Sequence, residues 1–135
     1  MNILHIFSII SWVLLPTVMF GGYSLLNLLA RKTAWLTEER TRSFRAGHAH
    51  AGVLLLLSLS YYIYLAQTTL PQTLQLGGCL TLLLGILAQS GGFFLHMLTA
   101  RAGKFSIGNG VTVVGALLLV CAVLLLVYGL IFAHS

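Results

Sequence analysis

Four long apolar runs take up almost the whole chain and leave almost nothing for a water-soluble domain. Of the 135 residues, 59% are hydrophobic and 7% are charged, whereas a soluble domain carries about 25% charged residues. Each run can cross roughly 30 Å of hydrocarbon as a helix that rises about 1.5 Å per residue. The sequence therefore predicts an all-α polytopic membrane protein, a single transmembrane domain folded as a four-helix bundle, with helices at approximately Ile3–Ala30, Ala46–Gln67, Leu74–Ala100 and Ile107–Ala133.

The seven basic residues gather in two of the three connections between these runs, and the second connection, 68–73, has none. Cytoplasmic loops carry an excess of Lys and Arg. We therefore expect both basic loops to face the cytoplasm and both termini to lie outside, most naturally in the cytoplasmic membrane of a bacterium. The basic loops on one side of the membrane account for the net charge of +5. We therefore expect the protein to contact lipid and not nucleic acid. The basic residues are Arg31, Lys32, Arg40, Arg42, Arg45, Arg101 and Lys104.

A helix start precedes the second apolar run. Thr37 followed by Glu38 and Glu39 is typical of a capped first turn with acidic residues near the positive end of the helix. These glutamates are the only acids in the chain, and we interpret them as a solvated helix start. At the other end of this run, Tyr61, Tyr62 and Tyr64 are predicted to mark the outer interface.

Five polar side chains are expected at similar depth, one or two turns inside the cytoplasmic boundary. Polar and ionisable residues are rare in lipid-facing positions and are usually functional. Because these five come from all four predicted helices, we expect a shared internal layer near the cytoplasmic surface. Its members are Asn27, His48, His50, His96 and Asn109.

Helical spacing decides which of the histidines can act together. His48 and His50 point about 200° apart on a regular helix, so they face one axis only if the first turn is distorted. His48 shares a face with Gly52, and His96 shares a face with Gly92. Since their helices run antiparallel, the sequence predicts a matched pair, with each glycine one turn deeper than its histidine.

The two histidines of this pair are suitably placed to ligate a haem b. His48 and His96 would supply the axial ligands, and the two glycines would leave room for the macrocycle. Arg45 and Arg101 lie toward the cytoplasm, where they could bind the haem propionates. The leading hypothesis is therefore a small membrane redox protein that transfers electrons alone or as a subunit of a larger membrane complex.

Two alternatives stay open. His48, His50 and His96 could form a three-histidine site for copper, zinc or iron. The protein could also be non-redox, either a transporter component that binds a small polar solute as a homo-oligomer, or a structural or assembly subunit. We find no phosphate-binding glycine loop and no nucleophile with a positioned base. Hydrolase and ATPase activities are therefore disfavoured, and enzymatic activity in general is left open.

Small residues recur every seven positions in the third and fourth runs. Such spacing lets transmembrane helices approach closely, so we expect these two helices to form a tight antiparallel pair. The repeating positions are Gly78, Gly85 and Gly92 in the third run and Gly108, Gly115, Ala122 and Gly129 in the fourth.

The remaining candidate residues are interpreted more simply. Cys79 and Cys121 are expected about 10 Å apart in depth, which is too far for a disulfide. His5 and His134 fall beside the termini, where an interfacial position is expected.

Overall fold

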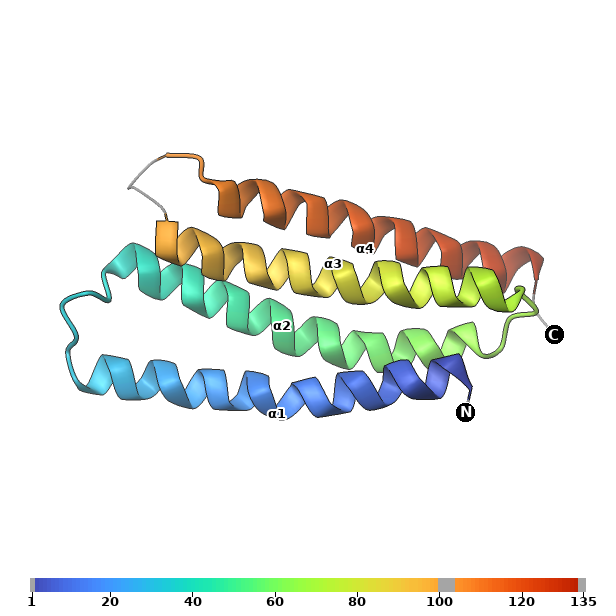
Figure 1. The fold of residues 1–135 in the computed structure, drawn as a ribbon, viewed down its shortest axis with the longest axis horizontal. Helices are drawn as coiled ribbons and strands as arrows, with labels where there is room; N and C mark the ends of the chain where they lie inside the picture. Colours follow the sequence, from blue (N-terminus) through green and yellow to red (C-terminus); the bar gives the residue numbers. More distant parts are fainter. Residues whose placement is uncertain (1, 100–103, 134–135) are drawn as a thin grey trace.

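The computed structural model describes residues 2–99 and 104–133, which form four long α-helices joined by short connections (Figure 1). The helices are α1 (Ile3–Ala30), α2 (Glu38–Leu65), α3 (Gln72–Thr99) and α4 (Ile107–Phe132). Each is long and apolar enough to cross a membrane. The expected all-α bundle of four candidate membrane-spanning helices is confirmed, and the direction in which its termini face stays a prediction.

The bundle has two distinct ends (Figure 1). Helices α1 and α3 end and α2 and α4 begin at one end of the bundle, while α1 begins and α4 ends at the other. Among the described residues, the charged side chains cluster at the first of these, which we call the basic end. It carries Arg31, Lys32, Arg40, Arg42, Arg45 and Lys104.

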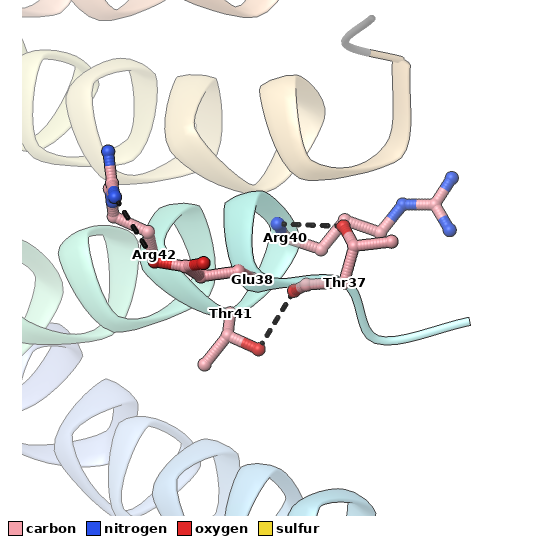
Figure 2. Close-up of polar contacts among 5 residues, drawn as sticks. All are labelled: Thr37, Glu38, Arg40, Thr41 and Arg42. Atoms are coloured by element: carbon pink, nitrogen blue, oxygen red, sulfur yellow. Dashed lines mark hydrogen bonds and ion pairs between the residues drawn. The ribbon is translucent and has the colours of Figure 1, made fainter. Parts of the chain in front are cut away.

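Helix α2 extends two turns beyond its apolar run at the basic end. Thr37 caps it, because its Oγ1 accepts a hydrogen bond from the Arg40 backbone N–H at 3.4 Å, and the Thr41 hydroxyl donates to the Thr37 carbonyl at 3.0 Å (Figure 2). Glu38 and Glu39 occupy the first turn, where carboxylates interact favourably with the helix dipole. This capped extension carries both acids to the level of the last turn of α3.

The helices lie in chain order, with α2 and α3 in the centre (Figure 1). The most extensive contact is between α3 and α4, followed by those between α2 and α3 and between α1 and α2. Among the described residues, α1 and α4 do not touch each other. The flanking helices therefore present most of their apolar side chains to the lipid.

The predicted glycine seam between α3 and α4 is present at Gly85, Gly92, Gly108 and Gly115, whereas Gly129 faces Leu70 and Thr68 of the α2–α3 connection. A Cβ atom on Gly92 would lie 2.6 Å from the Thr112 backbone nitrogen and 2.7 Å from the Gly108 carbonyl oxygen. A Cβ on Gly115 would lie 2.7 Å from the Gln89 Cα. Any residue larger than glycine would collide with the facing backbone at these positions, so the two helices are in backbone-to-backbone contact.

A buried cluster of hydroxyl groups joins the helices in the half of the bundle away from the basic end. The Ser11 and Ser58 hydroxyls lie 2.8 Å apart between α1 and α2, and the Tyr61 hydroxyl donates to the Ala122 carbonyl of α4 at 3.1 Å. Tyr62 and Cys79 are fully buried beside them. The expectation that Tyr61 and Tyr62 mark the outer interface is wrong, because both rings fill the core, whereas Tyr64 is exposed.

Candidate functional site at the basic end

The three central histidines point toward three different neighbours. His48 lies against α1, since a Cβ on Gly22 would be 3.0 Å from its Cε1 and Nε2 atoms. His50 stacks on Phe93 of α3 with ring centroids 4.9 Å apart, and its Nδ1 lies 2.8 Å from the Ala46 carbonyl oxygen. His96 is held by the residue before α4, with its Nδ1 2.7 Å from the Ser106 hydroxyl. The structure does not bring the three imidazoles together.

The expected pairing of His48 with His96 across α2 and α3 does not form. Gly52 faces α1, where its Cβ would lie 3.7 Å from Val18, and Gly92 faces α4. The glycine of α2 that meets α3 is Gly47, whose Cβ would lie 3.1 Å from both the Ser90 carbonyl oxygen and the Phe93 Cβ. Helical spacing correctly identified which residues share a face, but it does not say which neighbour that face meets.

The expected polar layer is likewise dispersed. Asn27 is exposed and accepts a hydrogen bond from the Arg31 Nε at 3.1 Å, while Asn109 is half-buried in the first turn of α4. Arg45 and His5 are exposed, and Arg101 and His134 lie outside the described residues. Within residues 2–99 and 104–133, no three His, Cys, Asp or Glu side chains converge on a common metal position.

A cleft does open at the basic end, between the start of α2 and the last turn of α3. Its volume is ≈ 410 Å³. Inside it, the His96 Nε2 lies 3.8 Å from the Glu39 Oε1, with His96 15% and Glu39 39% exposed. The cleft is lined by Thr37, Glu38, Glu39, Arg40, Ser43, His96 and Met97.

The arginines nearest to Glu39 are engaged elsewhere. Arg40 donates to the Trp35 carbonyl at 2.8 Å, and its guanidinium lies 4.5 Å from the centre of the Trp35 ring. Arg42 pairs at 3.5 Å with Glu38 on the exposed side of α2, and the two arginines extend in opposite directions (Figure 2). Among the described residues, His96 is therefore the one ion-pair partner of Glu39.

The cleft presents a carboxylate beside an imidazole, and Ser106 holds the orientation of the imidazole. Ser106 holds one ring nitrogen of His96 and leaves the other directed at Glu39. Such a pair can bind a cation between its two members, since both atoms are electron-pair donors when the imidazole is neutral.

Glu39 is the functional candidate that the sequence interpretation missed. A carboxylate in the first turn of a helix usually stabilises the helix through its dipole. This explanation accounted for Glu39 without any functional role. The length of the α2–α3 connection could have identified it. Because this connection is short and the two helices are antiparallel, residues equally far from it lie at the same depth. The start of α2, with Glu39, is therefore level with His96.

Fold and cleft together define the class: an integral membrane protein of four helices, with a carboxylate–imidazole cleft at its basic end. Comparison with known protein families, with curated proteins and with solved structures found no match to this chain.

Proposed function

We propose that this protein binds a transition-metal cation in the cleft at its basic end, with the Glu39 carboxylate and the His96 imidazole as ligands. The observation that carries the proposal is the 3.8 Å separation of the His96 Nε2 and the Glu39 Oε1. Two ligands bonded at about 2.1 Å to a tetrahedral ion are about 3.4 Å apart. A small closing movement would therefore place both atoms on one cation.

The surroundings of the pair support this proposal. Metal-ligating histidines usually have their second ring nitrogen fixed by a hydrogen bond, as Ser106 fixes Nδ1 of His96. Neither Arg40 nor Arg42 neutralises Glu39, and the cleft has room for water to complete the coordination shell. An ion pair that served only to join two helices would not need such a space.

The cellular setting follows from the basic loops. If these face the cytoplasm of a bacterium, the cleft opens to that compartment. The protein would then hold a metal at the inner membrane surface, alone, as a homo-oligomer or as a subunit of a larger membrane complex.

Metal titration of the purified protein tests this function. We expect the wild type in detergent to bind one Zn²⁺ or Co²⁺ per chain, and Glu39→Gln or His96→Gln to weaken binding at least about 10- to 100-fold, as loss of even a supporting group does. Calorimetry with Zn²⁺ and the visible spectrum of Co²⁺ measure this. His50→Gln is the matched control, because that ring stacks on Phe93 outside the cleft. Unchanged affinity in His96→Gln would exclude the site.

A haem b protein is the second candidate, and one observation favours it. The His48 imidazole is half-buried against α1, where Gly21 and Gly22 make room for it. No hydrogen bond to a described residue occupies this ring, so it could serve as an axial ligand if α1 moved away from its nitrogens. One such histidine per chain would require a second copy, or a partner subunit, to complete a bis-histidine haem.

The visible spectrum separates the two candidates. If haem is bound through His48, protein produced with a haem precursor should show an intense Soret band that His48→Ala abolishes. His96→Ala should keep the band, because that ring faces Glu39 and Ser106. The absence of any haem absorption in the wild type after supplementation would remove this candidate and leave the cleft as the site.

A further inference from the structure

We infer that the cation held in the cleft is copper(I), with the Met97 thioether as the third ligand. This inference rests on the proposed function of the cleft and specifies which metal that function concerns.

Met97 is placed for this role by its position on α3. It follows His96 in the chain, is 9% exposed, and lines the same cleft as His96 and Glu39. Most buried methionines only fill gaps in a core. Met97 differs because it lines a cleft that is also lined by an imidazole and a carboxylate.

The ligand chemistry favours copper(I) over zinc. Thioether sulfur is a soft ligand that selects copper(I), whereas zinc sites use thiolate, imidazole and carboxylate. Neither cysteine lines the cleft. Cys79 lies in the buried cluster in the opposite half of the bundle, and Cys121 is exposed along α4. The imidazole suits either metal and the carboxylate suits harder cations, so the thioether is the member of the set that favours copper(I).

The charge of the ion fits the site as well. A single positive charge is fully compensated by the Glu39 carboxylate, while the second carboxylate on the cleft wall, Glu38, is paired with Arg42. A divalent ion would leave one excess charge at an end of the bundle that already carries several arginines and lysines. Because the Coulomb energy scales with the product of the charges, these residues disfavour a divalent ion more than a monovalent one.

The test compares copper(I) and zinc(II) binding in wild type and in Met97→Leu. Leucine conserves the volume of the buried side chain and removes the sulfur. Under anaerobic conditions, competition with a chromophoric copper(I) chelator should show at least a tenfold loss of copper(I) affinity in Met97→Leu, while zinc(II) affinity changes by no more than about twofold. X-ray absorption at the copper edge should show a sulfur neighbour in the wild type that is lost in this variant.

Met19→Leu is the matched control. Met19 is 69% exposed on α1, so this variant should bind both metals as the wild type does. Equal copper(I) affinity in wild type and Met97→Leu would overturn the inference. Binding of zinc(II) without copper(I) would overturn it too, but would leave the cleft as a metal site. If the wild type binds neither metal, both the inference and the proposed function fail.

Discussion

Replacing Gly115 by alanine is expected to lower the melting temperature of the detergent-solubilised protein by several degrees. The added Cβ would contact the Gln89 backbone nitrogen and lie 2.8 Å from the Ala88 carbonyl carbon. A facing backbone cannot move aside as a flexible side chain does, so α3 and α4 must separate. Overpacking of this kind costs about 1–3 kcal/mol of unfolding free energy, and in lipid close packing itself is what joins the helices.

Gly110→Ala is the matched control for the seam. Gly110 is in the same helix, but an added Cβ meets no atom within 4 Å. Alanine there should leave the melting temperature unchanged or raise it, because glycine costs a helix interior up to about 1 kcal/mol relative to alanine. Thermal unfolding followed by circular dichroism distinguishes the two variants. Equal melting temperatures would refute backbone contact between α3 and α4 at Gly115.

Replacing Tyr62 by alanine should destabilise the protein still more. The Tyr62 ring is 2% exposed and packs against Phe7 and Tyr61, with ring centroids 6.1 and 5.9 Å away. Removing a large buried ring leaves a cavity and typically costs about 3–5 kcal/mol. The unfolding free energy of the variant in mixed micelles measures this loss. Tyr64→Ala is the control, because Tyr64 is 51% exposed.

A second substitution at Tyr62 is expected to have the opposite effect on stability. The Tyr62 hydroxyl is buried close to the Ser11 and Ser58 hydroxyls, but lies outside good hydrogen-bond geometry with any described group. A buried polar atom without a partner costs about 1–3 kcal/mol, so Tyr62→Phe should keep or increase stability. A marked loss in Tyr62→Phe would show that the hydroxyl is bonded to this pair in solution.

The helices and the seam were predictable because the lipid environment restricts both the backbone and the helix contacts, and both restrictions are visible in the sequence. Backbone groups in hydrocarbon must be paired within a helix, so four apolar runs give four helices. Glycines at intervals of seven show where two helices touch. Thr37 similarly indicated the true start of α2, two turns before its apolar run.

Which side of each helix meets which neighbouring helix was not predictable in the same way. In a soluble protein the apolar side faces the core, but a transmembrane helix is apolar toward lipid and toward protein alike. Nothing in the sequence of α2 therefore says that His48 meets α1 while Gly47 meets α3. For the same reason Tyr61 and Tyr62 resembled interfacial tyrosines until their neighbours were known.

The weak attachment of α1 has a consequence for the order in which the protein opens. Helix α4 is held by backbone contact along its seam, whereas α1 contacts mainly α2, through side chains such as Phe7 and Ser11. Local opening starts where the fewest contacts must break. Helix α1 should therefore detach as a unit while α2, α3 and α4 stay assembled, and separately produced α1 should be able to reassociate with them.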